Sequence, residues 1–402
     1  MHAPGRKGNR HVHTMRHDCG RRCAERLRAE RCAGVGRCDR RSDRRKRSAI
    51  APALKVETLA TGLKFPWSLA FVPDGDILII EKTGGLRIFR DGSLLPEPVA
   101  GTPDEVMVNS DSGLHDIALD PDFETTRRVF IAYANGDEDA NRLAVWRARF
   151  DGKRLVDGES IFRVTPDKAG PSHPGGRILF LPDKSFLLTV GDGYDFREEA
   201  QNLSSDLGKI LRLDRDGNPP ADNPFVGRDG ARPEIWTYGH RNPQGLAFDA
   251  ETGVIWELEH GPRGGDEINR LTAGANYGWP LTTNGIDYDG TLVSERAHAQ
   301  GVISPLIVWA PSIAPSGLAV YRGIKFPDWG GHFLVGGLAS KSLVRGQIDN
   351  DGRSIEEAER LLEDVGARLR DVRVGPDGFV YILTDEPEGR LLRLSPAATP
   401  QG

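Results

Sequence analysis

Two polar clusters flank a pair of apolar runs in the stretch GHRNPQGLAFDAETGVIWELEHGPRGGDEINRL, residues 239–271. Arg241 and Asn242 precede the first run, and charged residues surround the Gly261-Pro262 bend after the second. Strand ends need Gly, Pro and Asn for turns, but they do not need histidine, arginine and carboxylate together. Arginine binds carboxylates through a planar, bidentate guanidinium, and a neutral histidine accepts a proton near pH 7. The carbonyls of the bend and the nearby carboxylates suit a hard cation such as Ca²⁺.

One pattern of an apolar run, a polar turn and a second apolar run recurs along the chain. Its six copies begin at Trp67, Leu114, Gly175, Gln244, Ser316 and Leu369. Short strands bounded by Asp-Gly turns and repeated in this way are typical of β-propeller blades. We therefore predict an all-β, six-bladed β-propeller of four-stranded antiparallel blades. The early run LKVETLATGL has no copy of its own, so we expect it to pair with the last blade and close the ring. A β-sandwich array is the rival interpretation, but it does not explain the repetition.

The predicted propeller gathers polar residues from different copies at one place. The loop before the first strand of each copy should face the central channel, so its residues should converge. The candidates in these loops are Asp111, His173, Arg241, Asn242, Ser312, Arg368 and Arg370. Such a set is typical of a pocket for a small polyanionic ligand. A polycarboxylate ligand, a hard cation and a base together favour a quinone cofactor over a nucleotide.

The first 50 residues differ in composition from the rest of the chain. They hold 16 lysines and arginines against five acidic residues, and all four cysteines. The cysteine spacings do not fit a zinc module, and a basic arm for nucleic acid is a further alternative. We interpret residues 1–50 as a disordered or mis-assigned extension and residues 51–397 as the propeller, without a nucleic-acid partner. No run of 18 apolar residues predicts a membrane span, and no apolar stretch precedes SAIAPA to form a readable secretory signal.

Several long motifs in order resemble one known family. GHRNPQGLAF, EHGPRGGDEIN, HPGGRI, VGDG, APSIAPSGLAVY and RLRDVRVGPDG are similar to those of the glucose/sorbosone dehydrogenases, soluble aldose sugar dehydrogenases that use pyrroloquinoline quinone (PQQ). The resemblance runs from about Val56 to Leu394 and implies the same six-bladed propeller. It also implies a periplasmic or secreted location.

The resemblance implies roles for the residues that react or hold the metal. His173 matches the general base that takes the proton from the anomeric hydroxyl of the sugar. Arg241 matches the arginine that polarises the quinone carbonyl during hydride transfer, and Asn242 is a further cofactor contact. The backbone carbonyls of Gly261 and Pro262 match those that hold Ca²⁺ against the cofactor.

The resemblance also implies how PQQ is bound. Lys341, Arg368 and Arg370 match the cations that hold the PQQ carboxylates, and Ser312 matches a hydroxyl contact. Asp111 stands where the family often has Gln, and an acid there repels carboxylates unless it is protonated or paired.

Three hypotheses follow for the function of the chain. The first is PQQ- and Ca²⁺-dependent oxidation of the C1 hydroxyl of aldoses to lactones, with electrons passing to an external acceptor. The second is a binding propeller without a cofactor, and the third is a Ca²⁺-dependent lactone hydrolase. The combination of His173 with Arg241, Lys341, Arg368 and Arg370 favours the dehydrogenase, because a binding protein has no need of all five.

Overall fold

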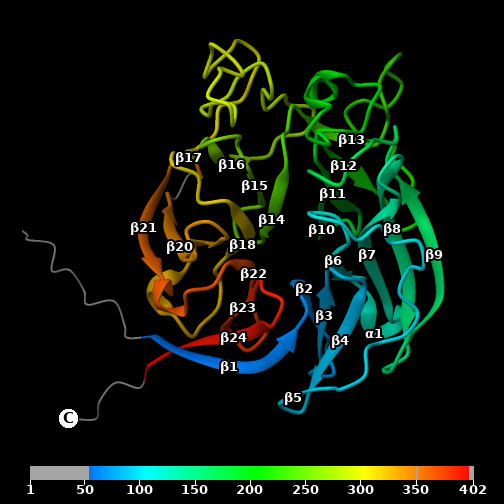
Figure 1. Cartoon of the computed structure of the whole chain (residues 1–402), viewed down its shortest axis with the longest axis vertical. Helices are drawn as coiled ribbons and strands as arrows, with labels where there is room; N and C mark the ends of the chain where they lie inside the picture. The colour runs from blue at the N-terminus through cyan, green and yellow to red at the C-terminus, as the bar shows by residue number, and fades with distance from the viewer. Residues whose placement is uncertain (1–53, 350–351, 398–402) are drawn as a thin grey trace, which may run out of the picture. The chain divides into compact units, whose positions relative to one another are not determined.

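The computed structural model of the chain describes residues 54–349 and 352–397. The predicted extension, residues 1–50, lies outside these described residues. The described chain forms six antiparallel sheets of four strands each, which are arranged as the blades of a propeller (Figure 1). The prediction of a six-bladed β-propeller is confirmed.

Each repeat of the sequence supplies the first strand of one blade. These strands are β2 (Pro66–Phe71), β6 (Leu114–Leu119), β10 (Gly175–Phe180), β14 (Pro243–Asp249), β18 (Pro315–Val320) and β22 (Leu369–Val374). In the first five blades the next three strands of the chain follow outward in order.

The remaining strands complete the blades from the inside outward. Blades 1 to 3 contain β3 (Ile77–Glu81), β4 (Gly85–Arg90), β5 (Ser93–Leu94), β7 (Arg128–Gly136), β8 (Asn141–Phe150), β9 (Leu155–Arg163), β11 (Phe186–Val190), β12 (Lys209–Leu213) and β13 (Ile235–Tyr238). Blades 4 to 6 contain β15 (Val254–Glu259), β16 (Asp266–Arg270), β17 (Ile307–Trp309), β19 (Phe333–Gly337), β20 (Leu343–Ile348), β21 (Ile355–Leu361), β23 (Val380–Thr384), β24 (Gly389–Pro396) and β1 (Leu54–Leu63).

Helices are few and short in the described chain. They are α1 (Phe123–Thr126) and the 3-10 turns η1 (Arg197–Gln201), η2 (Pro327–Trp329) and η3 (Glu363–Val365). None of the helices in this part of the chain has the length and apolar character needed to cross a membrane.

The ring closes by pairing the two ends of the propeller. β1 pairs antiparallel with β24, from Leu54 opposite Pro396 to Leu63 opposite Gly389. In Figure 1 the blue β1 accordingly lies beside the red β24. The expectation that LKVETLATGL pairs with the last blade is confirmed.

Apolar side chains on both faces of the sheets form the core between neighbouring blades. Trp67 and Leu78 of blade 1, for example, share one cluster with Ile131 of blade 2, whereas Phe130 and Ala132 of blade 2 share the next with blade 3. Adjacent residues of β7 therefore face opposite neighbours, as the alternation of side chains along a strand requires. Burial of both faces explains why many of these strands are continuously apolar.

A buried ion-pair network joins the inner strands at the channel. Arg177 of β10 lies 2.9 Å from Asp371 of β22 and 3.6 Å from Asp116 of β6. The Arg177 guanidinium also lies 4.1 Å from the ring centre of Trp67 in β2. Because four blades meet in these contacts, the network fixes the inner strands whose preceding loops carry the candidate site.

Candidate active site

A pocket of about 180 Å³ opens where the loops before the innermost strands converge. Asp111, His173, Asn242, Arg368 and Arg370 all line it. These residues come from the second, third, fourth and sixth repeats, so the predicted convergence occurs. Their roles in binding and catalysis stay predictions.

His173 is held in one orientation by Asp192. The Nδ1 of His173 lies 2.7 Å from the Oδ1 of Asp192, and Asp192 also accepts hydrogen bonds from the indole N–H of Trp279 (2.8 Å) and the backbone N–H of Tyr194 (2.8 Å). His173 has a left-handed backbone with φ of 50°, a conformation that a non-glycine residue adopts at an energetic cost.

The protonation states of the pair follow from its surroundings. Burial lowers the pKa of His173 and outweighs the opposing effect of Asp192. Burial alone would raise the pKa of Asp192, but the hydrogen bond from His173 and the charge of Arg241 hold it below its usual value. Asp192 is therefore an anion that accepts the Nδ1 proton, and Nε2 of the neutral His173 is left to accept a proton.

Cations gather on another part of the pocket lining. Lys82, Arg368 and Arg370 all line it. Asp385 accepts hydrogen bonds from Arg368 and Arg370, each at 3.0 Å. The buried Nε of Arg370 has no hydrogen-bond partner among the described residues. Three cations against Asp111 and Asp385 leave the lining with an excess of positive charge, which suits a ligand with several carboxylates.

Arg241 occupies a small recess that shares Tyr288 with the pocket. Its guanidinium donates to the carbonyl oxygen of Gly261 at 2.7 Å and lies 5.4 Å from the ring centre of Trp279. Its backbone N–H donates to Oε2 of Glu259 at 2.6 Å. Arg241 is thus fixed beside the bend that sequence analysis predicted to bind a metal.

The Gly261-Pro262 bend is tightly folded. A β-carbon on Gly261 would lie 2.3 Å from the carbonyl oxygen of Gly264, so this position requires glycine. The backbone N–H of Gly261 donates to Oδ1 of Asp266 at 3.0 Å. In this structure the Gly261 carbonyl accepts from Arg241, and a Ca²⁺ ion at that oxygen would have to replace the guanidinium.

Two predicted cofactor residues do not line the pocket. The Ser312 hydroxyl donates to Oδ2 of Asp266 at 2.6 Å, and Lys341 is exposed in the turn between β19 and β20. Ser312 therefore contacts Asp266, the first residue of β16, which follows the Gly261-Pro262 bend. The cofactor roles of both residues stay predictions.

Sequence reasoning missed several residues of the pocket. Lys82 follows the second strand of blade 1, and Trp67 and Gln244 belong to innermost strands. His115, by contrast, stood out in the sequence after Gly113-Leu114 as a residue that could reshape the pocket, and it does line it. It is buried, and both of its ring nitrogens lack a hydrogen-bond partner among the described residues. The basic charge of Lys82 next to a Gly-Gly turn was the one signal available, and it is common at strand ends.

The six-bladed propeller thus carries a pocket that combines the buried His173–Asp192 pair with a cluster of cations. The chain belongs to the glucose/sorbosone dehydrogenase family, whose model matches residues 63–393. Aldose sugar dehydrogenase YliI of Escherichia coli (strain K12) is 41% identical over 353 residues, which cover 86% of this chain and 94% of that protein.

Two solved structures extend the comparison. The apo form of the soluble aldose sugar dehydrogenase of Escherichia coli has a TM-score of 0.83 and 40% identity, covering 86% of this chain and all (100%) of that one. The PQQ-bound form of aldose sugar dehydrogenase from Streptomyces coelicolor has a TM-score of 0.69 and 29% identity, with coverage of 86% and 100%.

Proposed function

We propose that this enzyme oxidises the C1 hydroxyl of aldose sugars to lactones with PQQ as its cofactor. The observation that carries the proposal is the presence of the His173–Asp192 pair in the same pocket as Lys82, Arg368 and Arg370. A base alone would suit many hydrolases. A base beside an excess of cations suits a reaction on a small substrate next to a polycarboxylate cofactor.

The residues fit PQQ by the chemistry of their donors. PQQ is a tricarboxylate, and the guanidinium groups of Arg368 and Arg370 and the ammonium of Lys82 are charged donors for carboxylates. When bound, PQQ supplies the acceptor for the hydride of the sugar C1.

The protein's own part of the reaction is to hold the sugar and move a proton. Nε2 of His173 accepts the proton of the C1 hydroxyl, and the Asp192 anion stabilises the imidazolium that forms. Asn242, whose amide oxygen accepts from the Gln244 amide at 3.1 Å, contributes a fixed polar group to the same lining. Electrons then leave to an external acceptor.

Calcium dependence forms a finer part of the proposal. Ca²⁺ prefers oxygen ligands, and the carbonyls of Gly261 and Pro262 are the candidates. An ion held there would compete with Arg241 for the Gly261 carbonyl, and the guanidinium would then be available to donate to the cofactor. The observation that supports this coupling is the 2.7 Å hydrogen bond that joins Arg241 to the bend.

We also propose that the protein acts outside the cytoplasm, in the periplasm or as a secreted enzyme. Cell fractionation with antibody detection tests this location directly. Recovery of all the protein with the cytoplasmic fraction would contradict it.

Reconstitution tests the proposed activity. The purified chain is mixed with PQQ, Ca²⁺ or both, and dye reduction is followed with a panel of aldoses. Activity that needs both additions and a sugar is the expected result. A chain that binds PQQ in a spectral titration but reduces no dye with any aldose would overturn the proposed substrate class, and a chain that binds no PQQ would overturn the cofactor.

A further inference from the structure

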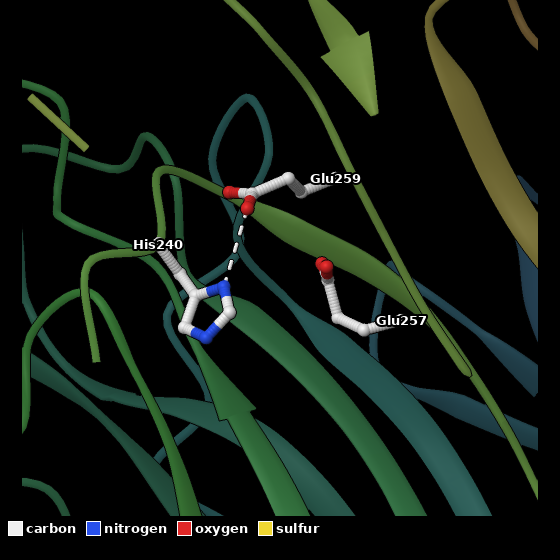
Figure 2. A group of neighbouring side chains, drawn as sticks. All are labelled: His240, Glu257 and Glu259. Atoms are coloured by element: carbon white, nitrogen blue, oxygen red, sulfur yellow. Dashed lines mark hydrogen bonds and ion pairs between the residues drawn. The ribbon is translucent and has the colours of Figure 1, made fainter. Parts of the chain in front are cut away.

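A second cluster of ionisable side chains lies in blade 4, away from the lining of the pocket (Figure 2). Glu257 and Glu259 are two residues apart in β15 and therefore point to the same face of the sheet. Asn269 and Glu267 of β16 lie opposite them, and His240 joins them from the loop before β14. One ligand atom each from His240, Glu257 and Glu259 lies within 4.8 Å of the others.

The cluster is buried and its hydrogen bonding is incomplete. His240 and Glu257 are 0% exposed, Asn269 is 1% exposed and Glu259 is 4% exposed. The Oε1 of Glu257 and the Oδ1 of Asn269 have no hydrogen-bond partner among the described residues. A buried oxygen without a partner is costly, so these two atoms indicate that a group which the protein itself does not supply belongs here.

The partners of the two glutamates do not neutralise their charge. Oε2 of Glu257 accepts from the Asn269 amide at 3.0 Å, Oε2 of Glu259 accepts from the Arg241 backbone N–H at 2.6 Å, and Oε1 of Glu259 lies 3.2 Å from Nδ1 of His240. No lysine or arginine side chain is among these partners. A cation bound here would therefore supply the balancing charge that these partners lack.

We propose that His240, Glu257 and Glu259 bind a divalent first-row metal ion such as Zn²⁺ or Mn²⁺. One imidazole and two carboxylates form a ligand set that such ions accept. The unpartnered Oε1 of Glu257 is the free ligand atom of that carboxylate, and the unpartnered Oδ1 of Asn269 is available as a further oxygen ligand.

Groups that would orient the ligands are already in place. Nε2 of His240 lies 2.9 Å from the Thr237 hydroxyl, so it can donate to that oxygen while Nδ1 binds the metal. The Asn269 amide holds one oxygen of Glu257, and the Arg241 backbone holds one oxygen of Glu259. Metal sites are typically supported by such hydrogen bonds to the outer atoms of their ligands.

The ion would act on the structure rather than in the reaction. Glu259 binds the backbone of Arg241 and directly precedes the His260-Gly261 segment, which packs against the Arg241 side chain. A metal on Glu259 would therefore stabilise the loop that carries Arg241 together with the bend.

Metal content and thermal stability of the full, untagged chain test the proposal. The protein is first treated with a chelator. It is then equilibrated without PQQ in excess Ca²⁺, to which either Zn²⁺ or Mn²⁺ is added. After desalting, its bound metal is measured by elemental mass spectrometry. The excess Ca²⁺ occupies oxygen-only sites such as the carbonyl bend. We expect the wild type to retain one more equivalent of metal than Glu257→Gln or His240→Gln, and to gain several degrees in Tm.

Glu251→Gln, an exposed change in the same blade, is the matched control and should retain the full equivalent. Thiols in general can bind Zn²⁺, and residues 1–50 contain four cysteines, so the readout is the difference in metal content between variants. Mn²⁺, which binds thiols weakly, is the independent probe. Equal metal content in the wild type and both variants, with either ion, would overturn the proposal. A wild-type Tm that neither ion changes, combined with a higher Tm in Glu257→Leu, would also overturn the proposal. The carboxylates of the cluster would then be neutralised by protons and not by a metal ion.

Discussion

The carboxylate of Asp192 binds Nδ1 of His173 at 2.7 Å and is itself fixed by Trp279 and Tyr194. The N–H groups of Trp279 and Tyr194 donate to both oxygens of Asp192, and its pKa lies below the usual value, so Asp192 is an anion that accepts the Nδ1 proton of His173. The pair therefore determines which nitrogen of His173 is free to act as a base.

Replacement of Asp192 by Asn should reduce turnover without loss of cofactor. An asparagine amide can donate to Nδ1, which moves the imidazole proton to Nε2 and removes the acceptor. We expect kcat to fall about 10²- to 10⁴-fold, while the Kd for PQQ changes little. Steady-state kinetics and a spectral titration measure the two quantities.

Asp195→Asn, an exposed change in the same loop, is the control for that variant. Equal kcat in Asp192→Asn and Asp195→Asn would contradict a role for Asp192 in positioning His173.

His115 should make the fold sensitive to acid. Burial lowers its pKa to about 3, whereas the unfolded chain titrates near pH 6.5. Between these values the unfolded state binds a proton that the folded state excludes, so stability falls as the pH drops below about 6.5, by about 1.4 kcal/mol per pH unit for this one group.

His115→Leu removes this contribution and the two unpartnered nitrogens. The slope of unfolding free energy against pH, from denaturant titrations between pH 7 and 4, should become shallower by about that amount. His298→Leu, a change at an exposed histidine, is the control. An unchanged slope in His115→Leu would show that His115 takes up its proton equally in the folded and unfolded states.

Repetition made the fold predictable, but side-chain contacts decided the details of the site. The positions just before or at the start of each repeated strand placed His173, Asn242 and Arg370 at one pocket, because the innermost strands of a propeller share one orientation. Lys82 was missed because it follows an inner strand instead of preceding one. The hydrogen bond of Ser312 to Asp266 joins residues 46 apart in sequence, and local sequence carries no signal for such a contact.

Lys82 and Lys341 give a direct test of which lysine serves the ligand. Lys82 lines the pocket with Arg370, whereas Lys341 does not line it. A hydrogen bond to a charged group contributes about 1.5–3 kcal/mol, so Lys82→Met should weaken PQQ binding roughly 10- to 100-fold. Lys341→Met should weaken it less, and calorimetric titration compares the two. A larger loss of PQQ affinity in Lys341→Met would support the PQQ-binding role that the family resemblance implies for Lys341.

Arg177 should matter for stability more than any exposed arginine. Its guanidinium is buried between Asp371 and Asp116, which Arg373 also contacts, so Arg177→Met leaves two buried carboxylates to share the single cation of Arg373. Removal of one member of a buried ion pair costs about 3–5 kcal/mol, and chemical denaturation measures it. Arg149→Met, which breaks the exposed pair with Asp157, should cost about 1 kcal/mol or less. Similar losses in both variants would contradict a structural role for the network.

Oxidation at C1 with His173 as the base is tested most directly by the rate at which bound PQQ is reduced in a single turnover. The rate is compared between C1-deuterated and undeuterated glucose. We expect a slower reduction with the deuterated sugar, and loss of the reduction in His173→Ala although PQQ still binds. Equal rates with both sugars, or unimpaired reduction in His173→Ala, would contradict oxidation at C1 with His173 as the base.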